Sequence, residues 1–385
     1  MKSYDVAIIG LGTMGSFTAL ELARRQVSVA GLDQFVPPHH RGSHSGETRV
    51  FRMAYYEHPD YVPLAQRSGL LWDGLGQEFG TTLLTRSGML SMGPEESEII
   101  FGIRQSSRLH NLEVETLSAA EIRSRFPAFQ PQDDFVGLLE KTAGWIDADA
   151  SIQYALQQAK DLGAELILDN PVLGWECREN QLKVKTEREN LIATKLIITA
   201  GAWANQVLRD LGLPLTVKRK VLAWFDPLQP EQFEEEKIPI FAFAPNLFYG
   251  FPNIGGRGVK VGEHLGGNLV HDLNLPVMPP SSEDLDSLVE TASEVVPTLI
   301  GPPPGRDVRL LRTMTCLYTL TPDEHFIIDR HPRHQNVFFA AGFSGHGFKF
   351  APVMAKALAD LALDGTTTLP IDFLRLKGRF EKSRN

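Results

Sequence analysis

The alternation of apolar and polar positions is clearest at the N-terminal end of the chain. Residues 4–9 form a short apolar run rich in β-branched side chains, which predicts a buried strand of a parallel sheet. A glycine-rich segment, residues 10–15, follows directly, and residues 16–26 then carry apolar side chains at helical spacing. A second apolar run, residues 27–32, ends at Asp33. The predicted order is strand, glycine turn, helix, strand and acidic residue.

Similar patterns recur along the rest of the chain. Strands are predicted at 164–168, at 191–199, in glycine-interrupted pieces over 241–262, and ahead of Gly342; helices are predicted at 151–162, at 282–295 with Ser282 as a possible N-cap, and from about 350 to 363. A change of composition near Val217 marks a boundary. Strands and helices that alternate in this way are typical of an α/β protein.

The first glycine turn has the spacing of a dinucleotide-binding motif, G-x-G-x-x-G, at Gly10, Gly12 and Gly15. Glycines allow a tight turn and a close approach of the backbone to a pyrophosphate, which the N-terminus of the following helix can bind. Asp33 can accept a hydrogen bond from a ribose hydroxyl. The motif predicts dinucleotide binding but does not decide between NAD and FAD.

Composition limits the remaining possibilities. The 385 residues suffice for two domains, and the formal net charge of -9 argues against nucleic-acid binding. No apolar run approaches the roughly 20 residues of a membrane span. The two cysteines favour a reducing compartment, and we expect a cytoplasmic protein. We assign no metal ligands.

Two further segments carry candidate chemistry. Residues 37–61 contain the small residues Gly42 and Ser43, which suit close packing of backbone against a ligand. Arg49 and Arg52 are three positions apart, so on a helix they would share one face; the alternative is a pair of solvated arginines on a surface turn.

The C-terminal part of the chain predicts a second contribution to the nucleotide site. A strand runs into the glycine-rich turn that begins at Gly342, and the helix that follows has free N–H groups and partial positive charge at its N-terminus. Gly201, which follows the strand at 191–199, could form another edge of the site. A nucleotide site built from both ends of a chain is more typical of a flavoprotein than of a simple NAD dehydrogenase.

Six segments in order give the chain a resemblance to a known family over nearly its whole length. They are GLGTMG (10–15), PPHHRGSHSGETRVFR (37–52), FYGF (248–251), VKVGEH (259–264), CLYTLTPDEHFIID (316–329) and AAGFSGHGFKF (340–350). The sequence resembles monomeric sarcosine oxidase and its relatives, including N-methyltryptophan oxidase. The resemblance implies a two-domain α/β flavoprotein with a Rossmann-like FAD-binding domain and a mixed-sheet catalytic domain. It places the FAD-binding domain at 1–85, 146–215 and 321–385, and the catalytic domain at 86–145 and 216–320.

The resemblance also implies a cofactor and its attachment. In this family FAD is bound covalently through a cysteine sulfur, and Cys316 matches that position. From the residues alone, a buried structural thiol would be the favoured interpretation of Cys316. The implied cofactor site comprises Gly10, Gly12, Thr13, Met14, Gly15, Asp33, Gly42, Ser43, Thr48, Arg49, Val172, Gly201, Cys316, Gly342, Gly345, Gly347 and Lys349. Cys177 lies in no such motif.

The family oxidises the C–N bond of a secondary amino acid, and dioxygen reoxidises the flavin to give hydrogen peroxide. By resemblance, Arg52 and Lys349 bind the substrate carboxylate and Lys260 assists the reaction with dioxygen. The remaining implied site residues are Arg49, near the flavin, and Tyr249, His264, Tyr318 and His346, which line the substrate pocket. None of these is an obvious essential base.

These implications predict a monomeric oxidase of sarcosine or a similar N-methyl amino acid. Alternative substrates are N-methyltryptophan, pipecolate or a glycated amino acid. Two different classes of protein also fit the motifs: an FAD dehydrogenase that uses another electron acceptor, and a flavin-binding protein without activity. Met53 and Tyr56 depart from the smaller or more polar residues expected after Arg52, which leaves the substituents of the substrate open.

Overall fold

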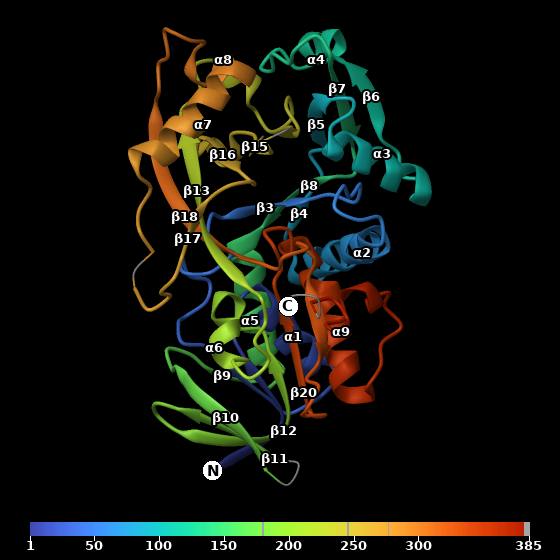
Figure 1. The fold of residues 1–385 in the computed structure, drawn as a ribbon, viewed down its shortest axis with the longest axis vertical. Coiled ribbons are helices and arrows are strands. Elements are labelled where there is room, and N and C mark those ends of the chain that lie inside the picture. Colours follow the sequence, from blue (N-terminus) through green and yellow to red (C-terminus); the bar gives the residue numbers. More distant parts are fainter. Residues whose placement is uncertain (179–180, 245, 276, 381–385) are drawn as a thin grey trace.

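The computed structural model describes residues 1–178, 181–244, 246–275 and 277–380. The predicted domains also include residues 179–180, 245, 276 and 381–385, which lie outside the described residues. Two large sheets lie towards opposite ends of the longest axis (Figure 1). A small antiparallel sheet lies between them, formed by β3 (Thr48–Phe51), β8 (Gly144–Asp147) and β4 (Leu84–Thr85). The architecture is a mixed α/β fold.

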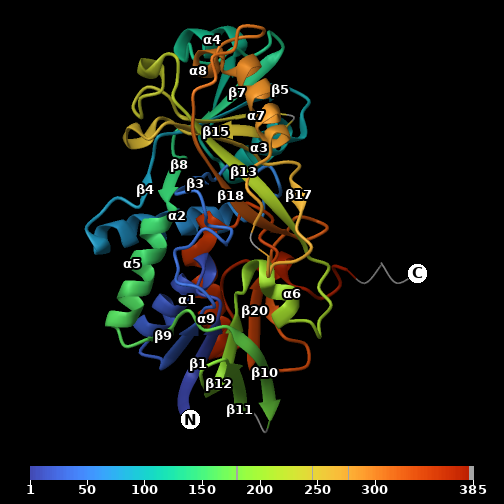
Figure 2. The same ribbon diagram turned by 90° about the vertical axis from the view of Figure 1, so that its left-hand side faces the viewer.

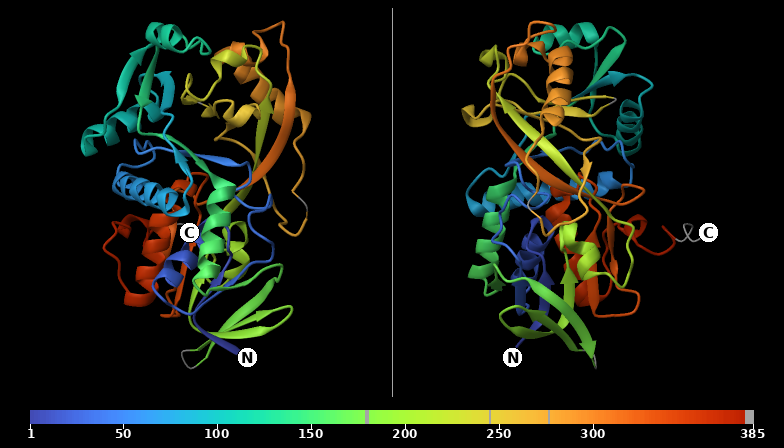
Figure 3. Two further views of the ribbon diagram at one scale, coloured as in Figure 1. Left: turned by 180° about the vertical axis from the view of Figure 1, so that it is seen from behind. Right: turned by 60° about the vertical axis from the view of Figure 1, so that its left-hand side comes forward.

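The first large sheet has a parallel centre. Its order is β9 (Glu165–Ile167), β2 (Val29–Leu32), β1 (Lys2–Ile9), β12 (Asn190–Ile198) and β20 (Val337–Ala341). Antiparallel partners extend it: β10 (Val172–Arg178), β11 (Gln181–Thr186) and β19 (Ile327–Arg330). Helices α1 (Thr13–Arg24), α5 (Ala148–Asp161) and α9 (Ala351–Asp364) cover one face (Figure 3).

The residues of β1 show why this sheet is buried on both faces. Val6 and Ile8 belong to the hydrophobic core under the three helices, whereas Ala7 and Ile9 belong to the core on the opposite face. Successive side chains of a strand point to opposite faces, so a continuous apolar run satisfies both cores. The buried parallel strand predicted at residues 4–9 is confirmed.

The second large sheet is mixed and lies in the other half of the molecule (Figure 2). Its order is β17 (Asn268–Leu269), β13 (Thr216–Phe225), β16 (Val259–Glu263), β15 (Phe248–Gly250), β14 (Ile240–Phe243), β5 (Met89–Pro94), β7 (Phe135–Glu140) and β6 (Glu115–Ser118). β18 (Leu310–Leu320) also pairs with β13. The remaining helices are α2 (Tyr61–Phe79), α3 (Glu98–His110), α4 (Ala119–Arg125), α6 (Ala204–Val207), α7 (Ser282–Val295) and α8 (Pro297–Ile300).

The two faces of strand β13 have different neighbours: one face packs in the hydrophobic core under α7, and the other carries residues of the candidate site. Ala223 and Phe225 belong to the core under α7, whereas Leu222 and Trp224 point to the opposite face. There they cluster with Cys316 and Tyr318 of β18. The alternation of the strand therefore places Cys316 on the side of the sheet away from the α7 core.

Most predicted elements are present within a few residues of their expected limits, and helix α7 has the predicted limits 282–295. Its cap differs: Ser281, not Ser282, is the N-cap and forms a capping box with Asp284. Arg49 and Arg52 do not share a helix face, because Arg49 lies in β3 and Arg52 follows that strand. Among the described helices, none combines the length and apolar character needed to cross a membrane.

Candidate active site

The first glycine turn packs tightly against the end of β12. A Cβ atom on Gly10, whose φ is +94°, would lie 2.6 Å from the carbonyl oxygen of Thr199, and one on Gly15 would lie 1.8 Å from the carbonyl oxygen of Gly10. Helix α1 begins at Thr13, and no side chain caps its N-terminus. The first-turn N–H groups thus lack a side-chain acceptor and can bind an anionic ligand.

A cavity of about 800 Å³ extends from this turn along the carboxyl ends of β1, β2, β12 and β20. Ligands of open parallel sheets bind at this edge. Predicted cofactor residues that line the cavity are Gly10, Gly12, Thr13, Met14, Asp33, Gly42, Ser43, Arg49, Val172, Gly201, Gly342, Gly345 and Gly347. Its size and its glycine-rich wall fit a dinucleotide such as FAD.

Asp33 is fixed at the end of β2. Its Oδ2 accepts a hydrogen bond from the backbone N–H of Leu11 at 2.7 Å, and its Oδ1 accepts one from Phe35 at 2.9 Å. Burial raises the pKa of Asp33, and the two backbone donors oppose that shift. Each carboxylate oxygen retains a lone pair for a ribose hydroxyl.

A second cavity, of about 100 Å³, adjoins the first. The two share lining residues Arg49, Tyr318, Gly345 and Phe348. All of the predicted catalytic residues line the second cavity: Arg49, Arg52, Tyr249, Lys260, His264, Tyr318, His346 and Lys349. The predicted cofactor residues Thr48 and Cys316 also line the second cavity, and neither lines the first. Gly15 lines neither cavity, and its role is the packing of α1 on the turn.

Arg52 is held in a buried ion pair. Its Nη2 donates to Glu57 Oε1 at 2.5 Å, and its guanidinium carbon lies 4.1 Å from the ring centroid of Tyr55 and 4.8 Å from that of Tyr56. Burial alone would raise the pKa of Glu57, but the guanidinium of Arg52 outweighs it and lowers the pKa to about 2. Both partners are therefore charged, and the alternative of two solvated arginines is wrong for Arg52, which is buried.

Lys349 reaches the same cavity from the turn before α9. Its Nζ donates to the carbonyl oxygen of His346 at 2.8 Å and to the hydroxyl of Tyr55 at 3.1 Å. Burial lowers the pKa of Lys349, and Arg52 adds to this effect. A third N–H of the ammonium remains for a ligand. Arg52 and Lys349 can thus act together on one carboxylate.

The His346 ring is committed to hydrogen bonds within the protein. Its Nε2 lies 3.0 Å from the carbonyl oxygen of Glu324, to which it must donate, so Nδ1 accepts from the hydroxyl of Tyr55 at 2.9 Å. Burial lowers the pKa of His346 to about 3. His346 is therefore neutral and positions Tyr55 and Lys349.

Lys260 points from β16 towards Arg49 and the small sheet. Its Nζ donates to the carbonyl oxygens of Gly46 at 3.0 Å and Thr48 at 2.9 Å, and also contacts Thr48 Oγ1. Burial lowers the pKa of Lys260, as does the charge of Arg49. Both residues line the small cavity, and Arg49 lines the large cavity as well.

Tyr318 and His264 form a neutral wall. The Tyr318 hydroxyl lies 3.4 Å from His264 Nδ1, and burial lowers the pKa of His264 to about 4. Burial also raises the pKa values of Tyr249 and Tyr318. A Cβ atom on Gly345, whose φ is +81°, would lie 2.1 Å from Tyr318 Cε2, so a glycine is required where this turn meets the ring.

Cys316 is a free, buried thiol opposite Lys220 on β13. Burial raises its pKa, while Arg49, Lys220 and Lys260 oppose the shift. The cations favour a thiolate, but burial outweighs them, so Cys316 is protonated in this structure. Cys177 is half-buried and its Sγ contacts Asn336 Oδ1 at 3.7 Å.

Several residues of the site carried no signal in the sequence. Glu57 pairs with Arg52, Glu140 accepts hydrogen bonds from the backbone N–H groups of Met53 and Ala54, and Lys220 is buried beside Cys316. Charged residues in a loop or strand give no periodic pattern. The large cavity is also lined by Phe35, His44, Thr199, Trp203 and Ser344.

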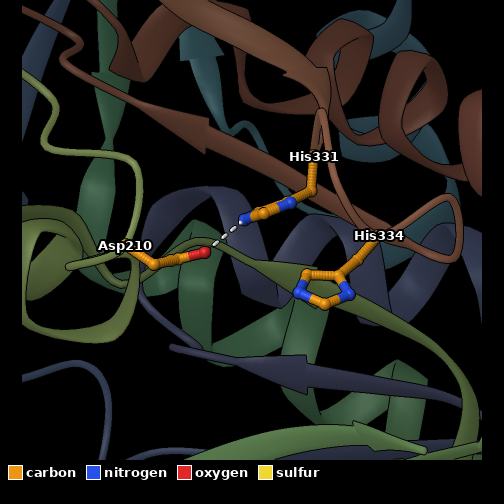
Figure 4. Close-up of side chains that lie close together, drawn as sticks. All are labelled: Asp210, His331 and His334. Carbon is orange, nitrogen blue, oxygen red and sulfur yellow. Dashed lines mark hydrogen bonds and ion pairs between the residues drawn. The ribbon is translucent and has the colours of Figure 1, made fainter.

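Asp210, His331 and His334 come together beside the large cavity, with potential ligand atoms within 4.8 Å of one another (Figure 4). His331 Nδ1 accepts from the backbone N–H of Arg333 at 3.1 Å, so Nε2 carries the proton and donates to Asp210 at 2.9 Å. Arg333 also pairs with Asp210. Because these bonds occupy both His331 nitrogens, we assign no metal to the cluster.

Comparison with known proteins agrees with this arrangement. The family described as FAD dependent oxidoreductase matches residues 5–361. The chain belongs to this family and is an FAD-dependent oxidoreductase.

Relatives with known names are similar over almost the full length. Monomeric sarcosine oxidase of Streptomyces avermitilis is 40% identical, covering 96% of each chain. N-methyl-L-tryptophan oxidase of Salmonella agona is 33% identical, covering 97% of this chain and 98% of the relative. A solved structure of L-proline dehydrogenase from P. horikoshii has a TM-score of 0.84 at 22% identity, covering 97% of each chain, and shows the shared fold.

Proposed function

We propose that this protein oxidises a small secondary amino acid, with sarcosine as the leading substrate, and passes the electrons to dioxygen to give hydrogen peroxide. The observation that carries the proposal is the cavity of about 100 Å³ that adjoins the dinucleotide-sized cavity and has Arg52, Lys349 and Lys260 in its wall. When bound, FAD supplies the acceptor for a hydride equivalent from the substrate C–N bond.

The residues of the cavity have separate tasks in this proposal. Arg52 and Lys349 bind the carboxylate, for which a planar guanidinium is well suited. The amine must be neutral to give up electrons, and the nearby cations lower the pKa of a bound amine. Lys260 and Arg49 place positive charge where reduction of dioxygen develops negative charge.

The cavity volume favours a small substrate. A cavity of about 150 Å³ holds benzene, with six heavy atoms. Sarcosine also has six heavy atoms, whereas N-methyltryptophan carries an indole in addition. The cavity of about 100 Å³ is smaller than this but shares part of its wall with the larger cavity, so of the two substrates it favours sarcosine, which needs less room. The name of the Salmonella agona relative keeps N-methyltryptophan as the second candidate, and pipecolate or a glycated amino acid would also need more room.

The proposal extends to the cofactor and its surroundings. We assign FAD to the unit formed by 1–85, 146–215 and 321–385, and the substrate to the unit formed by 86–145 and 216–320. Cys316 is the proposed covalent attachment point, supported by its place in the wall of the small cavity, by its packing with Tyr318, which lines both cavities, and by the nearby cations. A monomer in the cytoplasm is proposed from the name of the Streptomyces avermitilis relative and the two free cysteines.

A substrate panel tests the proposal. Purified protein is mixed anaerobically with sarcosine, N-methyl-L-tryptophan, pipecolate, L-proline, a glycated glycine, or glycine as the primary-amine control, and the flavin absorbance is followed. We expect sarcosine to bleach the flavin at the lowest concentration. No bleaching by any secondary amine would overturn the proposed function, and preference for N-methyl-L-tryptophan would overturn the size argument.

A further inference from the structure

Lys220 lies directly opposite Cys316 in the antiparallel pairing of β13 with β18. Directly opposed residues point to the same face, with Cβ atoms about 4.5–5.5 Å apart. That face also carries Leu222, Trp224 and Tyr318, away from the α7 core. Lys220 and Cys316 are each 4% exposed, so a buried amine faces a buried thiol.

The surroundings of Lys220 give its amine little compensation for burial. Its Nζ donates to the carbonyl oxygen of Leu265, and the backbone at Gly267 covers the side chain, since a Cβ there would lie 2.9 Å from Lys220 Cδ. Within the described residues, Leu265 provides its one hydrogen-bond acceptor, although an ammonium has three N–H groups. Charged and titratable groups that act on Lys220 are Cys316, Glu263, Lys218, Asp284 and His264; the Tyr318 ring centroid lies 5.7 Å from its Nζ.

We propose that Lys220 accepts the proton of the Cys316 thiol when that cysteine attaches the flavin, an inference that rests on the proposed covalent tether. The proton passes from Sγ to Nζ, and the electron pair of the S–H bond stays on sulfur. Overall, the thiol S–H and a flavin methyl C–H are replaced by one S–C bond. Dioxygen takes up the two electrons and two protons as hydrogen peroxide.

The other cations near Cys316 are less suited to this task. Arg49 cannot lose a proton in a protein. Burial lowers the pKa of Lys260 as well, but three oxygen atoms already accept from its Nζ, and the residue opposite Lys260 on β13 is Trp224. Burial lowers the pKa of Lys220 to about 8, so part of the amine is neutral near physiological pH. The strand pairing places this amine directly across from the thiol, so Lys220 can act as a general base when its Nζ turns from the Leu265 carbonyl to Sγ.

The test follows covalent attachment in the full-length chain. Wild type, Lys220→Met, Lys220→Arg and the strand control Lys195→Met, in the other large sheet, are purified and incubated with added FAD over a range of pH. The readouts are the intact mass and the flavin retained after acid precipitation. Circular dichroism and FAD binding before attachment check the fold, and Lys220→Gln replaces Lys220→Met if the latter is unfolded.

We expect the wild-type attachment rate to rise with pH as Lys220 loses its proton. Both Lys220→Met and Lys220→Arg should attach flavin about 100-fold more slowly at neutral pH, with the profile moved to higher pH, because a positioned base contributes about 10²–10⁴-fold. Lys195→Met should match wild type. Rapid attachment in Lys220→Met would overturn the inference.

Two further outcomes distinguish a failure of Lys220 as the base from a failure of the proposed covalent tether at Cys316. Rapid attachment in Lys220→Arg together with slow attachment in Lys220→Met would show that charge, and not proton uptake, matters, and would overturn the assignment as a base. Wild-type flavin that is released by acid would overturn both the tether and the inference. The substrate panel would still test the proposed oxidase activity in that case.

Discussion

The guanidinium of Arg52 and the carboxylate of Glu57 form a buried ion pair, with 2.5 Å between Nη2 and Oε1. Arg52 lines the small cavity, so a substrate carboxylate would share this guanidinium with Glu57. Replacing Arg52 alone would leave Glu57 buried without its partner, which costs about 3–5 kcal/mol of stability. The contribution of Arg52 to ligand binding therefore has to be measured with Glu57 neutralised.

The first prediction compares the double variant Arg52→Ala/Glu57→Gln with Glu57→Gln. Loss of one charge-assisted contact to a ligand should weaken binding of the carboxylate inhibitor methylthioacetate by about 1.5–3 kcal/mol, or roughly 10- to 150-fold. Flavin absorbance titration gives the affinities. Lys349→Met should show a loss of similar size. Unchanged affinity in both comparisons would place the carboxylate elsewhere.

The second prediction concerns Lys260. Lys260→Met keeps most of the apolar stem and removes the ammonium. Stopped-flow absorbance should show a modest change in anaerobic reduction by substrate. Reoxidation by dioxygen should slow by orders of magnitude, because a preorganised charge at a developing anion contributes about 3–4 kcal/mol.

Lys195→Met is the matched control for Lys260→Met, since Lys195 is a half-buried strand lysine in the other large sheet. It should leave both half-reactions at the wild-type rate. Equal slowing of both half-reactions in Lys260→Met would indicate general damage to the site, and no change in either would rule out the proposed role.

The third prediction assigns substrate size to Tyr56. Its side chain lines the small cavity together with the apolar residues Ile99, Ile103 and Leu247. Gly102 of α3 closes the space behind it, because a Cβ there would lie 2.5 Å from the carbonyl oxygen of Tyr56. Tyr56→Gly should raise kcat/KM for N-methyl-L-tryptophan relative to sarcosine by about tenfold or more. Tyr56→Phe keeps the ring and should retain the wild-type ratio; an unchanged ratio in both variants would refute the assignment.

The fourth prediction follows from the low pKa of His264, about 4. A group with this pKa is neutral from pH 6 upwards and cannot produce a change of rate there. The rise of kcat/KM with pH should instead follow loss of the substrate's amine proton. His264→Gln should therefore keep the same midpoint in the pH profile, even if the rate falls. A midpoint that moves with the substitution would identify His264 as the titrating group.

The parts of the fold that the sequence predicted are those set by local pattern. The strand, glycine turn and helix at the N-terminus depend on neighbours a few residues apart, and so does helix α7. The conformation at Arg49 was not predictable in this way, because β3 forms by pairing with β8, almost a hundred residues later. A helical spacing of two arginines carries no information about such a partner.

The site was predictable only where motifs carried the resemblance. Those motifs included every residue proposed as catalytic. In the structure, all of these residues line the small cavity. Glu57 and Lys220 were not found, because a charged residue in a loop or strand normally faces water. The burial of Glu57 depends on its ion pair with Arg52, and the burial of Lys220 depends on the pairing of β13 with β18.

The most direct test of the proposed oxidase is a single turnover with sarcosine in two stages. Anaerobic sarcosine should bleach the flavin fully, and admission of dioxygen should then restore the oxidised spectrum with one hydrogen peroxide formed per flavin. Bleaching that dioxygen fails to reverse would indicate a dehydrogenase with another acceptor. A flavin that sarcosine does not bleach would contradict the proposed substrate.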